Sequence, residues 1–131
     1  MEVDMFRRLL LVFGFISIFF VACSTSISPA DVVENYLTAL VAKDDILAVN
    51  LSCTAWESSA KADGAAFEGV EVTLENPSCS VISEDGQQAV VSCTGRFLFS
   101  YAGGEEEEIG LDRRDYLVLF EGGEWRMCGY Q

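Results

Sequence analysis

The first hydrophobic feature of the chain is one uninterrupted apolar run near its start. Residues 9–22 (LLLVFGFISIFFVA) carry no charge, and Arg7 and Arg8 precede them. A positively charged segment followed by such a run is typical of a secretory signal peptide. The run is shorter than the about 20 residues that a membrane-spanning helix needs. The sequence therefore predicts an export signal over residues 1–22, beginning at Met1 or at Met5.

After a short polar tether, residues 23–28, apolar residues recur with the period of an α-helix. Ser28 is a typical N-cap, with Pro29 in the first turn and Asp31 at the capping-box position. The positions that follow form one apolar stripe, which predicts a helix with a single buried face. Its members are Val32, Val33, Tyr36, Leu37, Leu40 and Val41.

Two shorter helical segments are expected next. Residues 43–45 (KDD) end the stripe, and residues 46–50 fit one short turn. Thr54 and Glu57 have the spacing of a second capping box. We expect the helix that begins there to run to about Asp63, with Gly64 as its stop.

From Gly69 the period of the pattern changes to two, which predicts strands. Pro77 interrupts the first strand, and residues 85–86 (DG) predict a tight hairpin turn into a second strand with a bend at Gly95. The apolar face of that second strand holds Val91, Cys93, Phe97, Phe99 and Tyr101. A third strand over about residues 107–120 and a turn at residues 121–124 place Phe120 opposite Trp125, and Val118 opposite Met127. Residues 29–131 therefore predict one α+β domain, with N-terminal helices packed on a curved antiparallel β-sheet.

The end of the apolar run resembles a bacterial lipoprotein lipobox. Ala22 and Cys23 stand where that family has a small residue and the cysteine that is acylated and becomes the mature N-terminus. Phe20 departs from the usual aliphatic residue of the motif. The resemblance implies lipidation at Cys23 and attachment of the domain to the membrane, facing the extracytoplasmic side. The alternative is ordinary cleavage near Ala22, which leaves Cys23 as a thiol.

The charge balance excludes one class of partner. The chain has 21 acidic and 8 basic residues and a net charge of −13, and the residues of the export signal do not change that balance. A protein that binds nucleic acid needs clustered basic residues. Arg113 and Arg114 could contact an acidic ligand, but Asp112 and Asp115 flank them and can neutralise them locally. We therefore expect no nucleic-acid binding.

Beyond Cys23, the cysteine count is even, which in an exported chain predicts two disulfides. Three pairings are possible in principle. The hairpin at residues 85–86 brings Cys79 close to Cys93, which leaves Cys53 to pair with Cys128. No Cys-x-x-Cys spacing and no histidine are present, so neither a zinc site nor a redox-active pair is expected.

The order of elements resembles the nuclear transport factor 2-like (NTF2-like, or cystatin-like) roll, in particular small exported bacterial lipoproteins. The residues that carry this resemblance are residues 29–37 (PADVVENYL), Trp56, the long strands and residues 125–128 (WRMC). The resemblance implies a pocket between sheet and helices, for which the candidate residues are Tyr36, Trp56, Tyr116 and Trp125. It also leaves a homodimer possible.

The chain offers no recognisable catalytic, cofactor-binding or metal-binding set. Asp112 and Tyr116 are expected on the opposite strand face from Asp115, and residues 105–108 (EEEE) lack the ligand spacing of a calcium loop. Our leading hypothesis is a non-enzymatic, membrane-tethered domain that binds a protein partner or a small apolar ligand. The alternative is a pocket enzyme of the ketosteroid isomerase or polyketide cyclase type.

Overall fold

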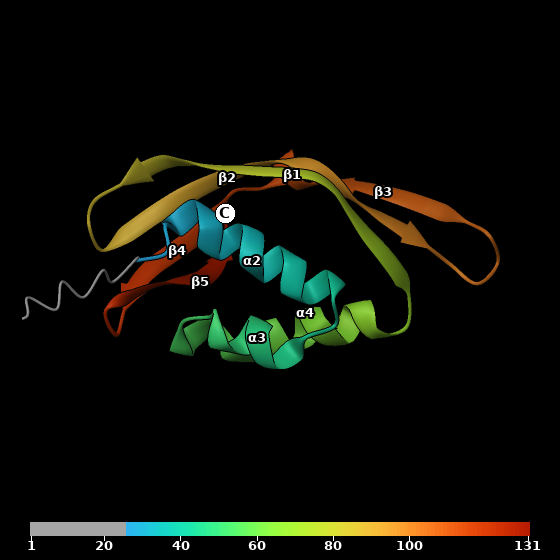
Figure 1. Ribbon diagram of the computed structural model, residues 1–131, viewed down its shortest axis with the longest axis horizontal. Helices are drawn as coiled ribbons and strands as arrows, with labels where there is room; N and C mark the ends of the chain where they lie inside the picture. Colours follow the sequence, from blue (N-terminus) through green and yellow to red (C-terminus); the bar gives the residue numbers. More distant parts are fainter. Residues whose placement is uncertain (1–25) are drawn as a thin grey trace, which may run out of the picture.

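The computed structural model of the chain describes residues 26–131, in which helices cover one face of a curved sheet (Figure 1). The expected export signal and Cys23 lie outside the described residues. The helical elements come first along the chain and the strands follow. The helical elements are α2 (Pro29–Val41), α3 (Asp45–Asn50), η1 (Thr54–Trp56) and α4 (Glu57–Glu68). The remaining elements are β1 (Glu71–Glu84), β2 (Gln88–Ser100), β3 (Glu106–Gly110), the 3₁₀ turn η2 (Leu111–Arg113), β4 (Tyr116–Glu121) and β5 (Glu124–Tyr130).

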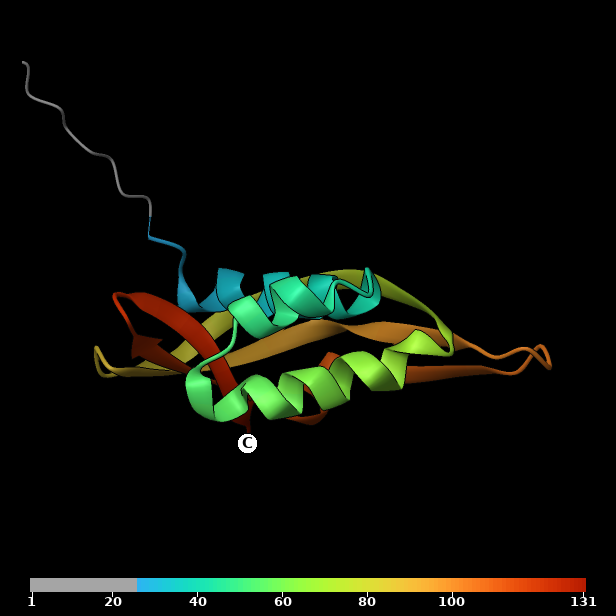
Figure 2. The same ribbon diagram turned by 90° about the horizontal axis from the view of Figure 1, so that it is seen from below.

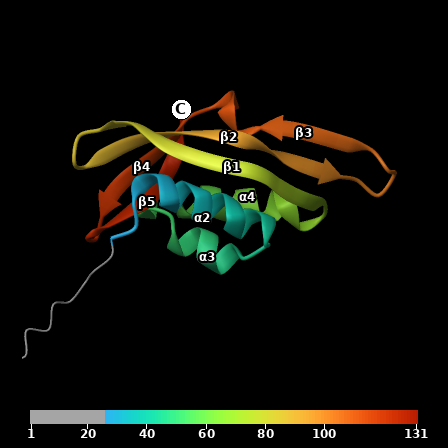
Figure 3. The same cartoon turned by 45° about the horizontal axis from the view of Figure 1, so that its top comes forward.

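All strand pairs in the described part of the chain are antiparallel, as the alternation predicted. The strand order is β1-β2-β4-β5, and β3 also pairs with β2, beyond the segment that β4 occupies. The tight turn after β1 is present, and Phe120 lies opposite Trp125 as expected. The β2–β3 hairpin extends past the helices at one end of the molecule, whereas the chain enters α2 at the other end, beside the β4–β5 turn (Figures 1 and 3).

Helix α2 forms the centre of the core. Ser28 caps it by accepting a hydrogen bond from the Asp31 backbone N–H, as predicted. Its apolar stripe packs across β1, β2, β4 and β5, and Val33 and Tyr36 are fully buried. Viewed from below, α2 and α3 flank one side of the molecule and α4 the other (Figure 2). The fold class predicted from the pattern, helices on a curved antiparallel sheet, is therefore confirmed.

Two expectations about α4 are wrong. Thr54 does not cap the helix, because η1 separates it from α4, whose N-cap residue is Trp56; the Thr54 hydroxyl donates to Glu121 on β4. The helix also continues through Gly64 to Glu68. Gly64 is buried where α4 meets α3, and a Cβ at this position would lie 2.2 Å from Oδ1 of Asp45. Glycine here permits close packing of two helices rather than ending one.

The strands differ from expectation at two places. Pro77 does not end β1; a bulge between Glu75 and Ser78, opposite the bend at Gly95, carries the strand past it. The single strand expected over residues 107–120 is wrong, because η2 divides it into β3 and β4. Both halves pair with β2, each with a different segment of it.

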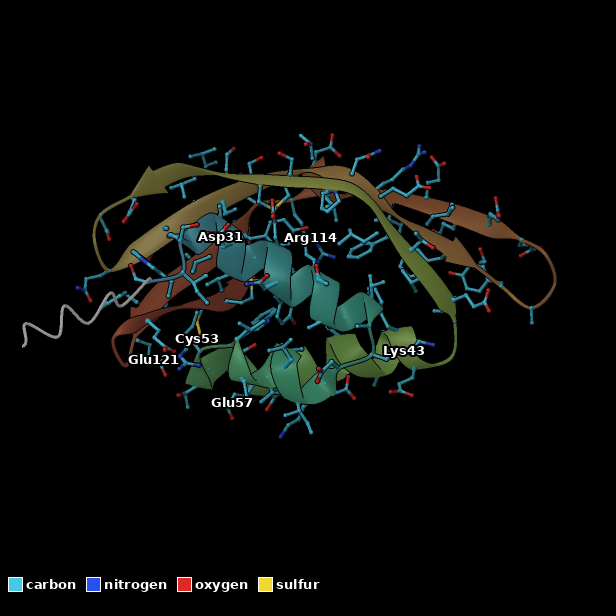
Figure 4. All side chains as sticks on the ribbon, in the orientation of Figure 1. Asp31, Lys43, Cys53, Glu57, Arg114 and Glu121 are labelled. Carbon is cyan, nitrogen blue, oxygen red and sulfur yellow. A yellow bond between two sulfur atoms is a disulfide. The ribbon has the colours of Figure 1, made fainter. Side chains whose placement is uncertain are left out.

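Two disulfides join distant parts of the domain, and they link the cysteines expected to pair. Cys79–Cys93 connects β1 to β2, and Cys53–Cys128 connects the start of η1 to β5 across a separation of 75 residues. Cys53 is labelled in Figure 4 beside its sulfur–sulfur bond. Backbone hydrogen bonds from Cys53 to Met127 and from Met127 to Leu51 reinforce this second junction. The last strand is thus fixed to the helical layer.

Among residues 26–131, no helix combines the length and the apolar character that a membrane span requires.

Candidate functional site

The most connected polar group between the two layers is the carboxylate of Asp63 on α4. Its Oδ2 accepts hydrogen bonds from the hydroxyl of Tyr36 on α2, at 2.8 Å, and from the hydroxyl of Tyr130 on β5, at 2.5 Å. The indole N–H of Trp56 donates to the Tyr36 oxygen at 3.3 Å. One carboxylate oxygen therefore ties a second helix and the last strand to α4.

Tyr130 reaches this cluster because β5 contains one extra residue. Leu117 pairs with Gly129 and Val118 pairs with Met127, so Cys128 has no partner of its own in β4. Such a bulge shifts the alternation of side chains between the two faces of the sheet. Tyr130 therefore lies on the inner face, whereas strict alternation from Met127 would place it on the outer face. Gly129 adopts a positive φ at the bulge and lies against the ring of Trp56. The backbone thus makes room for the aromatic cluster.

Burial sets the ionisation of the two phenols. Loss of solvation, followed by the neighbouring Asp63 carboxylate, raises the pKa of Tyr36 and the pKa of Tyr130 far above the ordinary value of about 10. Both tyrosines therefore stay neutral donors at physiological pH. Asp63 acts as their shared acceptor, so the cluster is a hydrogen-bonded brace between the layers.

A cavity of about 330 Å³ opens beside this brace. The inner part of its lining is apolar and its rim carries two arginines; the residues are Phe97, Ile109, Leu111, Tyr116, Arg113 and Arg114. The Tyr116 ring packs edge-on against Tyr130 at 5.7 Å, and the guanidinium of Arg114 lies 3.8 Å over the Tyr130 ring. Arg114 is labelled in Figure 4. Tyr130 of the brace therefore contacts two of the residues that line the cavity, Tyr116 and Arg114.

A second cavity, of about 260 Å³, lies at the end where the chain enters α2. Ile27, Leu51, Phe120 and Trp125 contribute to its lining. Phe120 and Trp125 pack edge to face at 5.3 Å across the β4–β5 hairpin, and Phe120 is 39% exposed. This cavity is therefore lined by aromatic and aliphatic side chains and reaches Val32 of the core.

The structure brings together three of the four residues expected at a pocket. Tyr36 and Trp56 belong to the Asp63 brace, and Tyr116 joins the brace to the arginine-rimmed cavity. Trp125 lies in the other cavity, with Phe120.

Sequence reasoning missed Asp63 and Tyr130. Asp63 follows Trp56 by two helical turns and precedes Phe67 by one, so the three residues share one face of the helix. A carboxylate on this otherwise apolar face was the signal that could have identified Asp63. Ending the helix at Gly64 hid it. The signal for Tyr130 was Gly129, since glycine within a strand often marks a bulge.

Among residues 26–131, no three histidine, cysteine or acidic side chains gather in a way that could hold a metal ion. The chain from Glu105 to Glu108 lies at the β2–β3 hairpin and is exposed. Glu107 and Glu108 instead bind neighbouring side chains, Tyr101 and Arg96 respectively.

Comparison with known proteins gives structural likeness and no relative in sequence. No protein-family model matches the chain, and no curated protein matches it. A proposed calcium/calmodulin-dependent protein kinase II association domain from Xanthomonas campestris has a similar structure, with a TM-score of 0.54 at 10% identity over 76% of this chain and 79% of that one. A proposed polyketide cyclase from Pseudomonas putida gives 0.53 at 13% identity, over 81% and 92%. A SEC-C motif containing protein from Rhodopseudomonas palustris gives 0.53 at 16% identity, over 79% and 78%.

The chain shares the fold of these solved structures, the predicted α+β roll of helices on a curved antiparallel sheet. At these identities the likeness concerns the fold alone, which hosts association domains and proposed enzymes alike. The brace lies between α4, α2 and β5, whereas the arginine-rimmed cavity is lined by residues from β2, β3, η2 and the start of β4. Function must therefore be argued from these two features.

Proposed function

We propose that the chain is an exported, membrane-tethered extracytoplasmic domain that binds a small apolar ligand and carries out no chemistry on it. In this proposal, residues 1–22 are removed, Cys23 carries the lipid, and the arginine-rimmed cavity is the binding site. The observation that carries the ligand-binding part is the cavity itself. Its volume of about 330 Å³ and its apolar inner lining match small-molecule sites, which begin at about 300 Å³.

The two disulfides support the export part of the proposal. Disulfides persist in oxidising compartments and are rare in the cytosol. Both bridges join elements of the folded domain, and Cys53 and Cys93 are fully buried. Buried bridges of this kind are structural rather than catalytic. Together with the apolar run behind Arg7 and Arg8, they favour a domain that folds after export.

The brace favours a structural role for Asp63, because one oxygen of its carboxylate already accepts two hydrogen bonds. A general base needs a free acceptor site within reach of a bound substrate. Oδ2 of Asp63 instead accepts from two tyrosines, and Asp63 lines neither of the two cavities described above. We therefore infer that Asp63 holds the two layers together.

One observation favours the second candidate, a pocket enzyme of the isomerase or cyclase type. Asp63 is a carboxylate within hydrogen-bond distance of Tyr36, in a fold that proposed polyketide cyclases share. An enzyme of this kind should lose its turnover in Asp63→Asn with the fold retained. A binding module has no turnover to lose, and its affinity for a ligand in the cavity should change little in the same variant.

Mass spectrometry of protein extracted from membranes tests the export part. We expect a chain that begins at Cys23, carries an acyl modification and contains no free thiol. Cys23→Ser should release the protein from the membrane fraction. Recovery of the uncut chain from the cytosol with all cysteines reduced would overturn the proposal.

Titration with decanol, an uncharged apolar probe, tests the ligand part. Saturable binding that shifts the NMR resonances of Leu111 and Tyr116 is expected, because these side chains line the cavity. Absence of saturable binding at the solubility limit of decanol would contradict a small-ligand function. A homodimer or a protein partner remains a prediction, and sedimentation measurements on the mature chain test the dimer.

A further inference from the structure

We propose that the ligand of the arginine-rimmed cavity is an organic anion: a small amphiphile whose oxyanion head group binds Arg113 and Arg114 while its apolar body fills the cavity. This inference rests on the proposed function and names the chemical class of the ligand.

The first argument is that, among the described residues of this strongly acidic protein, neither arginine forms an ion pair. The chain has a net charge of −13, yet the ion pairs found among residues 26–131 involve only Arg96 and Arg126 as cations. Arg113 and Arg114 take part in none of them. Among the described residues, Asp112 and Asp115 therefore form no ion pair with the two arginines, contrary to the expected local neutralisation. Two arginines that line the same cavity therefore remain available for an anion from solution.

The neighbouring aspartates have other positions. The backbone of Asp115 pairs in both directions with Gln131 at the end of the chain. The Asp112 carboxylate lies over the backbone of Gly110, where a Cβ would approach its Oδ1 to 2.5 Å. Asp112 therefore lies against Gly110 of the cavity lining, and it should weaken the binding of an anion without preventing it.

The second argument is that Arg114 is held in place before any ligand arrives. Its guanidinium stacks at 3.8 Å on the Tyr130 ring. Tyr130 is fixed in turn by its hydrogen bond to Asp63 and by edge-on packing against Trp56 at 5.1 Å. A stacked guanidinium keeps its N–H groups in the plane of the group, free to donate to a carboxylate in a bidentate manner. Ordering the arginine in advance lowers the entropy cost of binding.

The third argument is that charge and apolar surface are combined at one place. Arg113 and Arg114 are exposed at the rim, whereas Phe97, Leu111 and Tyr116 are buried. An inorganic anion would use only the rim and a hydrocarbon only the interior. A molecule with one oxyanion and an apolar body uses both.

The overall negative charge of the protein does not prevent this binding. At physiological ionic strength, exposed charges more than about 8 Å apart are largely screened from each other. The head group therefore responds mainly to the two arginines and Asp112, and the distant acidic residues mainly slow its approach. The acidic hairpin at residues 105–108 also adds a repulsive field that falls as salt rises.

The test compares decanoate with decanol, which share a hydrocarbon chain and differ in the charged head group. Calorimetric titration of the mature, disulfide-bonded protein should show decanoate binding about tenfold more tightly than decanol. Arg114→Gln and Arg113→Gln should each remove most of this preference and leave decanol affinity unchanged. Lys61→Gln is the matched control, because it removes one positive charge from an exposed position on α4. Asp112→Asn should strengthen decanoate binding by about threefold.

The possible results separate the two proposals. Equal affinity for decanoate and decanol would overturn the anion inference and leave the apolar binding function standing. Binding of neither probe would overturn both. A preference for decanoate that Lys61→Gln reduces as strongly as Arg114→Gln would also overturn the inference, since it would reflect total charge rather than the cavity. NMR shifts of the Arg113 and Arg114 side-chain Nε–H groups with decanoate, and not with decanol, are the direct signature expected.

Discussion

The hydroxyl of Tyr130, in the penultimate residue of the chain, donates to the carboxylate of Asp63 on α4. This single hydrogen bond joins the last strand to the last helix. It also fixes the ring on which Arg114 stacks. The stability of the domain and the geometry of its arginine-rimmed cavity are therefore linked through the same pair of residues.

Removing the carboxylate should destabilise the fold. We expect Asp63→Ala to lower the free energy of unfolding by about 2–4 kcal/mol, because it leaves the Tyr36 and Tyr130 hydroxyls without an acceptor in a poorly solvated region. Asp63→Asn keeps an acceptor oxygen and should cost less. Denaturant unfolding measures both. Lys61→Ala, exposed on the same helix, should stay within about 0.5 kcal/mol of the native chain; a loss as large as that of Asp63→Ala would contradict this account.

Stability should fall at alkaline pH. The native pKa values of Tyr36 and Tyr130 are raised above the unfolded value of about 10, so their contribution is complete below pH 10 and is lost as the pH rises above it. Each buried phenol should remove about 1.4 kcal/mol per pH unit above that point. Unfolding measured near pH 9 and near pH 11, in the native protein and in Tyr36→Phe, tests this. The variant should show the weaker pH dependence, and an identical dependence would exclude Tyr36 as a source.

The two disulfides should contribute unequally. Cys53–Cys128 spans 75 residues and Cys79–Cys93 spans 14. On the chain-entropy model, removing the first should cost about 4–5 kcal/mol and removing the second about 3 kcal/mol. Each pair contains one fully buried cysteine, so double replacement by alanine gives comparable packing losses. Unfolding free energies of the two double variants provide the comparison, and a larger loss for the Cys79–Cys93 pair would contradict the entropic ordering.

Gly64 should tolerate alanine only if its neighbour is changed as well. Alanine favours a helix by about 1 kcal/mol over glycine, but its Cβ would overlap Oδ1 of Asp45, a buried oxygen that has no hydrogen-bond partner within residues 26–131. We expect Gly64→Ala to destabilise the native chain by about 1–3 kcal/mol. In an Asp45→Ala background the same change should be neutral or stabilising. A double-mutant cycle measures this coupling, and additive effects would show that the contact is unimportant.

Features that neighbouring residues determine could be predicted from the sequence, and features that depend on distant contacts could not. The Ser28 cap, the α2 stripe and the Asp85–Gly86 hairpin are set by neighbouring residues, and all three are present. The end of α4 was misplaced because Gly64 is determined by contact with Asp45, a partner that its own neighbours do not reveal. The same holds for the division between β3 and β4, which depends on how each half pairs with β2.

The candidate site was predicted in part for the same reason. Tyr36 and Trp56 were expected at a pocket, and both belong to the brace. Tyr130 could not be assigned to the inner face from alternation, because one extra residue in β5 reverses it. The freedom of Arg113 and Arg114 from Asp112 and Asp115 is likewise a property of η2 and the strand that follows.

The junction between Cys53 and β5 also sets the order in which the domain can be completed. Helix α2 packs on strands that follow it in sequence by tens of residues. Strand β5, with Met127, Cys128 and Tyr130, follows the other strands in sequence. During synthesis from the N-terminus, the helices therefore lack part of the core that they pack against until β5 has been made. Contacts between segments that are distant in sequence slow folding. We therefore expect that most of the folding time passes before β5 docks onto the helical layer.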